Sequence, residues 1–391
     1  MPGKIWYENN LKGVSPMLYR KMNRIDRKLS ILGFGCMRLP QTSDFTIDET
    51  KATAMVRYAI DRGVNYIDTA YVYHNGQSES FLGRALADGY REKINLATKM
   101  PVWDIESRKD MDRILDEQLK RLNTDHIDFY LLHGLSRSSW NDMVDLNVGE
   151  FLDGAIADGR IGCAGFSFHD NIQSFKEIVD AYPWTFAQIQ YNYMDEGYQA
   201  GTEGLNYAAE KGLGLVIMEP LRGGVLARET AEIKKIWASG GKSRTAAEWS
   251  LRWLWNRPEI TVVLSGMSTM QQVKDNLGYA HAGKPSSLTV DEIAVYEQVK
   301  TFYRSRLKIP CTRCRYCLPC MGGVDIPECF SAYNDAFIYK DTAGAKFSYD
   351  AFTGTGGDAS QCQECGVCES LGPQQIPIRE RLKEVVALFG H

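Results

Sequence analysis

Short apolar runs rich in β-branched residues alternate with longer amphipathic stretches along most of the chain. The amphipathic stretches carry apolar residues three and four positions apart, most clearly over 48–62 and 109–122, which predicts helices there. The runs that we predict as strands are 31–37, 66–70, 94–100, 127–133, 161–167, 186–192, 214–220 and 261–267.

This alternation is typical of parallel strands joined by right-handed crossovers. Eight units match the strand count of a (β/α)8 TIM barrel, so the sequence predicts an α/β barrel. An open, doubly wound sheet shows the same alternation and is the alternative. It usually carries a GxGxxG motif after its first strand, and no such motif follows 31–37.

The pattern changes after two further helices, expected at about 269–281 and 289–306. Residues 310–329 are rich in Cys, Pro and Gly, and residues 341–360 have the small, polar composition and weak periodicity of a loop. A closing helix is expected at 376–390. We therefore predict two domains, 1–306 and 307–391.

Composition is that of a folded globular protein, with 44% hydrophobic and 24% charged residues in a chain of 391. The net charge is −4, and no basic run indicates binding to nucleic acid or to a membrane surface. The apolar runs are shorter than the ~18 residues that a membrane span needs. The start, MPGKIWYENN, lacks the apolar core of a signal peptide, so we expect a cytoplasmic protein.

Four polar residues fall at or just after predicted strand ends, where barrels of this type place their active sites. Asp68, Lys99 and His133 end the second, third and fourth strands, and Tyr73 follows Asp68 by five residues. A lysine ammonium would lower the pKa of a neighbouring tyrosine, an aspartate would hold the lysine, and a neutral histidine would orient a carbonyl oxygen. Each residue alone has an ordinary structural explanation, such as a helix cap or a core histidine. Together they favour proton delivery to a carbonyl oxygen as a hydride reaches its carbon.

The segments around these residues resemble the aldo-keto reductase family. They are GFGCMRLP (33–40), IDTAYVYHNGQSESFLGRAL (67–86), ATKM (97–100) and FYLLHGL (129–135). The resemblance covers about residues 25–300. It implies a barrel that reduces carbonyls with a nicotinamide cofactor, with Tyr73 as general acid, Asp68 and Lys99 tuning it, and His133 orienting the substrate.

The resemblance also implies where the nicotinamide binds. Ser167 and Gln188 match the carboxamide ligands, while Phe168 and His169 stand near the place of the family's Asn. Met218 takes the place of the stacking aromatic residue, in a turn that continues with Pro220 and Leu221.

The segment SGMSTMQQVKDN (265–276) matches the loop that holds the adenosine phosphate in the family. Gly266 and Gln272 align with the Lys and Arg that members preferring NADP use, and Asp275 and Asn276 fit the adenine contacts. A phosphate dianion needs a cationic partner, so we expect NAD(H) rather than NADP(H). An ordinary strand and turn is the alternative explanation of this loop.

Eight of the ten cysteines follow residue 310: Cys311, Cys314, Cys317, Cys320, Cys329, Cys362, Cys365 and Cys368. Consecutive Cys-x-x-Cys steps favour [4Fe-4S] clusters over zinc, which uses paired motifs. The segment resembles a bacterial ferredoxin module, which a subset of aldo-keto reductases carries at the C-terminus. That resemblance implies a module that packs over the C-terminal ends of the strands, and it makes an anaerobic host plausible.

One or two clusters are expected, because one ligand set is incomplete. In two-cluster ferredoxins the fourth Cys of each run serves the other cluster, so the second run would share a cluster with Cys320. The first three cysteines of the first run would meet Gly372 where their fourth ligand belongs. We favour Cys329 as that ligand. The alternatives are an iron with an open position, an empty site, and a simple buried thiol at Cys329.

The sequence thus predicts an NAD(H)-dependent oxidoreductase that acts on a small-molecule carbonyl compound. Trp103, Trp140, Tyr191 and Tyr193 are candidate pocket residues and suggest an aromatic or alicyclic substrate. One alternative is a cluster-assisted reduction of an activated C–O or C=C bond. Another is a non-catalytic protein that exchanges electrons with a partner.

Overall fold

The computed structural model describes residues 17–353 and 356–390. Within these ranges, eight parallel strands close into a barrel in the order β10-β3-β4-β5-β6-β7-β8-β9, which confirms the predicted (β/α)8 architecture. Every strand lies on its predicted run to within two residues. The strands are β3 (Leu32–Gly35), β4 (Tyr66–Asp68), β5 (Asn95–Pro101), β6 (Ile127–Leu135), β7 (Ile161–Phe168), β8 (Phe186–Gln190), β9 (Gly214–Met218) and β10 (Val262–Ser265).

Helices surround the barrel, and their boundaries follow local sequence signals. The third one starts at a capping box between Ser107 and Asp110, ends at Asn123 with φ of 50°, and buries Ile114 and Leu115 against the strands. The barrel helices are α1 (Glu49–Ile60), α2 (Gln77–Ala85), α3 (Arg108–Leu122), α4 (Arg137–Asp145), α5 (Val148–Ala157), α6 (Ile172–Ala181), α7 (Gly201–Glu210), α8 (Ala231–Ala238), α9 (Ala246–Trp255), α10 (Met270–Ala280) and α11 (Val290–Arg306).

A short antiparallel hairpin, β1 (Tyr19–Met22) with β2 (Arg27–Ser30), closes the N-terminal end of the barrel. Met22 and Leu29 are fully buried and join the side chains inside the barrel, among them Phe129. The prediction missed this hairpin because each strand has four residues and only these apolar anchors. The opposite end, where the strands terminate, is left for the site.

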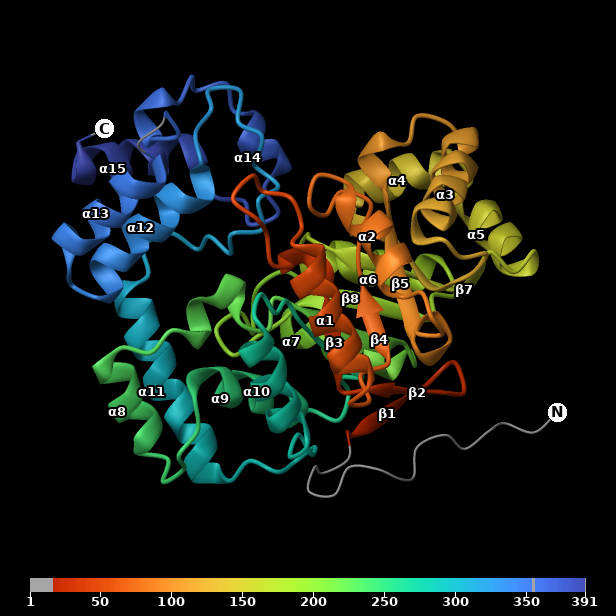
Figure 1. The fold of residues 1–391 in the computed structure, drawn as a ribbon, viewed down its shortest axis with the longest axis horizontal. Helices are drawn as coiled ribbons and strands as arrows, with labels where there is room; N and C mark the ends of the chain where they lie inside the picture. The colour runs from red at the N-terminus through yellow and green to blue at the C-terminus, as the bar shows by residue number, and fades with distance from the viewer. Residues whose placement is uncertain (1–16, 354–355, 391) are drawn as a thin grey trace.

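The C-terminal segment forms a separate group of helices beside the barrel, coloured blue in Figure 1. They are α12 (Ile326–Ile338), α13 (Thr342–Thr353), α14 (Val367–Leu371) and α15 (Ile378–Phe389). Helix α13 shows that the prediction of a loop over 341–360 was wrong for its first half. Small and polar residues weaken the helical pattern there, yet Ala345 and Tyr349 are buried. The closing helix is confirmed as α15.

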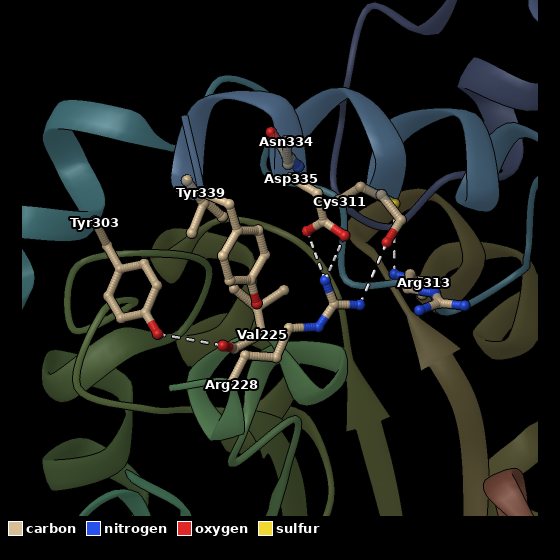
Figure 2. A pocket seen from close by; sticks show the side chains of 10 residues that line it. Val225, Arg228, Tyr303, Cys311, Arg313, Asn334, Asp335 and Tyr339 are labelled. Atoms are coloured by element: carbon tan, nitrogen blue, oxygen red, sulfur yellow. Dashed lines mark hydrogen bonds and ion pairs between the residues drawn. The ribbon is translucent and has the colours of Figure 1, made fainter. Parts of the chain in front are cut away.

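This segment has a hydrophobic core of its own, which includes Ile309, Phe330 and Val385. Figure 2 shows how it meets the barrel: Arg228 forms an ion pair with Asp335 of α12, at 2.5 and 2.7 Å. Among the residues described, no helix is long and apolar enough to cross a membrane. The N-terminal residues that carry the signal-peptide argument lie outside the described residues.

Candidate active site

The four predicted tetrad residues converge at the C-terminal mouth of the barrel. Lys99 Nζ donates to Asp68 Oδ1 and to the Thr69 carbonyl, each at 2.7 Å, and to the Tyr73 hydroxyl at 3.2 Å. The side chains of Lys99 and Asp68 are only 1% and 3% exposed. The His133 ring stands edge-on to Tyr73, with centroids 6.1 Å apart. The ammonium is thus placed to join a carboxylate to a phenol.

A hydrogen-bonded layer behind the tetrad fixes Lys99. Gln118 donates to the Lys99 carbonyl at 3.0 Å and to Glu79 at 2.8 Å, while Thr98 donates to Glu79 at 2.6 Å. Burial raises the pKa of Glu79, and Arg121 at 3.3 Å opposes that shift. These contacts tie β5 to α2 and α3, so the lysine is held by main chain as well as by its charge partner.

Burial dominates the ionisation of the tetrad. It raises the pKa of Asp68 and lowers that of Lys99, and their mutual attraction opposes both shifts. Burial and then the charge of Asp68 raise the pKa of Tyr73 well above 10, so the expected lowering by Lys99 does not prevail. The phenol therefore keeps its proton at neutral pH. Burial lowers the pKa of His133 well below 6.5, which keeps its imidazole neutral.

The residues expected to hold the nicotinamide line the neighbouring strand ends. Gln188 Oε1 is buried and has no hydrogen-bond partner within the described part of the chain, while Gln188 Nε2 lies 3.7 Å from Met218 Sδ. Ser167 Oγ accepts a hydrogen bond from the Gly134 amide at 2.7 Å. An orphaned buried amide oxygen fits a ligand that donates an N–H, as a carboxamide does.

The turn after β9 is shaped by Glu219 and Gly223, which were not predicted as site residues. Pro220 and Leu221 lie in it as expected. Glu219 has φ of 54° and accepts a hydrogen bond from the Gly223 amide at 2.6 Å. A Cβ on Gly223 would collide with the Thr312 carbonyl, so the turn packs directly on the cysteine segment.

The 265–276 loop is organised by its own contacts. Gln272 accepts from the Ser268 and Thr269 amides at 2.8 and 3.2 Å as part of the cap of α10. Asn276 donates to Ser265 Oγ at 3.0 Å, and Gln271 donates to Asp275 at 2.8 Å.

A cation that the sequence argument did not name lies beside this loop. The Arg38 side chain would touch a Cβ on Gly266. Its guanidinium donates to the Thr312 and Arg313 carbonyls, at 3.1 and 3.3 Å. The cysteine segment therefore engages this arginine.

A model of the Aldo/keto reductase family matches residues 31–294. This chain belongs to the aldo/keto reductase family. The oxidoreductase YqkF of Bacillus subtilis, described as uncharacterized, is 27% identical over 71% of this chain and 94% of that protein. A probable aldo-keto reductase 1 of Glycine max is 30% identical over 50% of this chain and 56% of that protein.

Solved structures agree with the assignment. The holo form of aldo-keto reductase AKR11C1 from Bacillus halodurans matches with a TM-score of 0.62 and 29% identity, over 72% of this chain and 96% of that one. The reductase is therefore an NAD(P)H-dependent oxidoreductase, and the non-catalytic alternative is set aside. The family match ends at residue 294, before the first C-terminal cysteine.

Five of the C-terminal cysteines of this reductase come together in one place. One pocket in the C-terminal segment is lined by Cys317, Cys320, Cys362, Cys365 and Cys368, so thiols from both runs meet. Burial raises the pKa of Cys311 to about 12. No three Cys, His, Asp or Glu side chains among residues 17–353 and 356–390 are placed to hold a single metal ion.

Cys329 is not among the side chains that line this pocket. It is fully buried on α12, its thiol donates to the Gly357 carbonyl at 3.7 Å, and burial raises its pKa to about 12. The role of Cys329 as the fourth ligand of the first cysteine set stays a prediction.

The cysteine segment also enters the active site, as the resemblance implied. Tyr316, between Cys314 and Cys317, shares a hydrogen bond of 2.7 Å with His133 Nε2. Tyr316 was not predicted as a site residue, because only the cysteines of that run have a recognisable spacing.

Of the predicted pocket aromatics, only Trp103 lies at the site, 5.0 Å from the His133 ring centroid. Trp140 packs on Trp184, and Tyr191 and Tyr193 pack on Trp253, so these three were wrong. They fill gaps between helices and strands.

Proposed function

We propose that this reductase converts an aldehyde or ketone to an alcohol, with Tyr73 as proton donor. The proposal rests on one observation: in the buried mouth of the barrel, Lys99 Nζ donates hydrogen bonds to both Asp68 and the Tyr73 hydroxyl. Nicotinamide cofactors supply a hydride. The protein must then hold the carbonyl, exclude water and give one proton to the oxygen.

Tyr73 meets the requirements of that donor. A phenol with a raised pKa is protonated when the substrate arrives, as a general acid must be. As negative charge develops on the carbonyl oxygen, the proton moves from Tyr73, and the adjacent ammonium stabilises the phenolate. Neutral His133 can donate to the same oxygen and fix its position.

Ser167, Gln188 and Met218 would hold the nicotinamide, supported by the unpartnered Gln188 oxygen. We propose NAD(H) over NADP(H). Gln272 is engaged in the cap of α10, and the nearby Arg38 guanidinium is engaged by the Thr312 and Arg313 carbonyls. A 2′-phosphate would have to compete for that cation. The adenine contacts of Asp275 and Asn276 remain part of this proposal.

We propose that residues 307–391 form a ferredoxin-like domain appended to a barrel of residues 1–306. Following the two-cluster ferredoxin pattern, Cys320 and the three cysteines of the second run would hold one [4Fe-4S] cluster, and all four line one pocket together with Cys317. A cubane binds one thiolate at each corner, so its ligands stand further apart than those of a single zinc ion. Cys311, Cys314 and Cys317 would hold a second cluster, for which Cys329 stays the proposed fourth ligand and an iron with an open position is the alternative.

A second function deserves a test because the cysteine segment reaches the catalytic histidine through Tyr316. Clusters supply single electrons, so the alternative is a cluster-assisted reduction of an activated C–O or C=C bond. The experiment is anaerobic purification with iron and sulfide analysis, followed by aldehyde reduction with NADH and NADPH. Reduction that persists after iron removal supports the first function, and loss of turnover with an intact barrel supports the second.

A further inference from the structure

His133 has two competing partners, the substrate in the proposed function and Tyr316 in the structure. In the proposed function His133 holds the carbonyl oxygen of the substrate. In the structure its Nε2 is engaged by the Tyr316 hydroxyl at 2.7 Å, and among the described residues its Nδ1 is buried without a partner. One ring nitrogen makes one strong in-plane hydrogen bond, so the substrate oxygen and the phenol compete for it.

The Tyr316 side chain contacts the groups that an aromatic carbonyl substrate would contact. Its ring lies 6.2 Å from the Trp103 ring, nearly perpendicular to it, and Trp103 lies 5.0 Å from His133. Trp103 is 48% exposed, so its side chain borders solvent. Tyr316 therefore presents an aromatic ring to Trp103 and an oxygen to His133, as an aryl aldehyde would.

Several hydrogen bonds attach the segment that carries Tyr316 to the barrel, so the docking of the segment itself places Tyr316 beside His133. Arg38 holds the Thr312 and Arg313 carbonyls. Gln199 donates to the Pro373 carbonyl at 3.0 Å, and Gln374 donates to Gln190 at 2.8 Å. These contacts tie both cysteine runs to the mouth of the barrel.

We propose that Tyr316 is a specificity-determining residue that occupies the carbonyl site as an internal substitute for an aromatic carbonyl substrate. A substrate binds by displacing its hydroxyl from His133 and placing an aromatic ring beside Trp103. This inference rests on the proposed function. It adds a substrate class, aromatic aldehydes and ketones, and a residue outside the tetrad that sets the affinity for them.

Tyr316→Phe tests the competition because it keeps the ring and removes the hydroxyl. With benzaldehyde as the probe, we expect KM to fall about three- to tenfold, the factor that one neutral hydrogen bond carries, and kcat to stay within about twofold. Tyr198→Phe is the matched control. That hydroxyl donates to the Pro373 carbonyl at 3.4 Å, so it joins the same two parts of the protein away from the tetrad.

Equal behaviour of the two variants would overturn the proposal, because it would reduce Tyr316 to an interface contact. A higher KM in Tyr316→Phe would also overturn it, since the hydroxyl would then help to hold the substrate. Benzamide gives a readout without turnover, because its carbonyl accepts a hydrogen bond and resists hydride. We expect it to bind Tyr316→Phe about three- to tenfold more tightly than wild type, and equal binding would contradict the competition even if no aldehyde is reduced.

The substrate class has its own test. We expect a lower KM for benzaldehyde than for cyclohexanecarbaldehyde, and we expect Trp103→Leu to remove the difference by raising only the benzaldehyde value. Equal KM values in the wild type would overturn the aromatic preference. Failure of the proposed function looks different: the wild type would reduce neither aldehyde with NADH or NADPH.

Discussion

The mouth of the barrel and the cysteine segment are organised in different ways. At the mouth, each charged group has partners supplied by the fold: Lys99 has three, and a layer behind it fixes its main chain. In the cysteine segment, burial raises the pKa of Cys311, Cys317 and Cys368. The first site is preorganised by ion pairs and hydrogen bonds, whereas the second is a pocket lined mainly by thiols.

The two regions nevertheless meet at a tetrad residue, through the hydrogen bond between Tyr316 and His133. A rigid barrel can supply the catalytic groups, and an attached segment can then set what reaches them. The comparison predicts that loss of a tetrad group acts on rate, whereas changes in the cysteine segment act on substrate binding and on the integrity of that segment.

The largest effect is expected from Tyr73→Phe, which removes the proton donor and leaves the ring. Carbonyl reduction should fall by ~10²–10⁴, the usual loss for a general acid, while NADH affinity stays near that of wild type. Steady-state kinetics and NADH fluorescence titration measure the two quantities. Tyr71→Phe is the control, since that hydroxyl donates to Glu117 at 3.1 Å outside the tetrad. A loss below tenfold in Tyr73→Phe would contradict its role.

The next effect separates the two regions by their dependence on iron. Cys365→Ala should lower the iron content of the anaerobically purified protein by about four atoms per chain, one cubane. It should also make the chain after residue 307 sensitive to limited proteolysis while the barrel survives. Cys163→Ala, at a buried barrel cysteine, should change neither the iron content nor the cleavage pattern. Unchanged iron in Cys365→Ala would remove Cys365 from the ligand set.

The sequence predicted the barrel and its site better than the junction, for physical reasons. Strand ends of a parallel barrel converge, so Asp68, Lys99 and His133 could be placed together from their positions alone. Tyr316 could not, because its contact depends on how two separately packed regions dock. The pKa of Tyr73 was missed since burial, which outweighs the neighbouring ammonium, is a property of the closed mouth.

Weak apolar periodicity also limited the prediction of helices in the C-terminal segment. Helix α13 lacks a strong apolar stripe, and its few buried side chains are recognisable only against α12 and α15.

The direction of side chains beyond the strand ends of the barrel was also not predictable. Three aromatic residues follow strand ends as pocket residues do, yet each packs between helices and strands: Trp140, Tyr191 and Tyr193. Sequence position locates a strand end but does not give the direction of a side chain beyond it.

A moderate effect is expected on the choice of cofactor. The wild type should bind NADH more tightly than NADPH, and Gln272→Arg should improve NADPH binding about tenfold, within the range for one charge-assisted contact to a phosphate. Gln272→Ala is the matched control, because both variants lose the cap contacts to the Ser268 and Thr269 amides. Tighter binding of NADPH than NADH by the wild type would show that a cation, with Arg38 the nearest candidate, already serves the 2′-phosphate.

The smallest effect concerns the junction under acid. Burial lowers the pKa of His169 to about 4, and its Nδ1 lies 3.2 Å from the Oε1 of Gln199, whose amide holds the Pro373 carbonyl. Because the folded pKa is lower than the unfolded value near 6.5, the unfolded state binds the proton more readily. The contribution of neutral, buried His169 to the free energy of unfolding is fully present above pH 6.5 and is lost as the pH falls toward 4. Between pH 7 and 5.5 the wild type should lose about 1 kcal/mol more unfolding free energy than His169→Gln, as measured by urea denaturation. Equal losses in the two proteins would show that His169 does not couple the barrel to the cysteine segment through its ionisation.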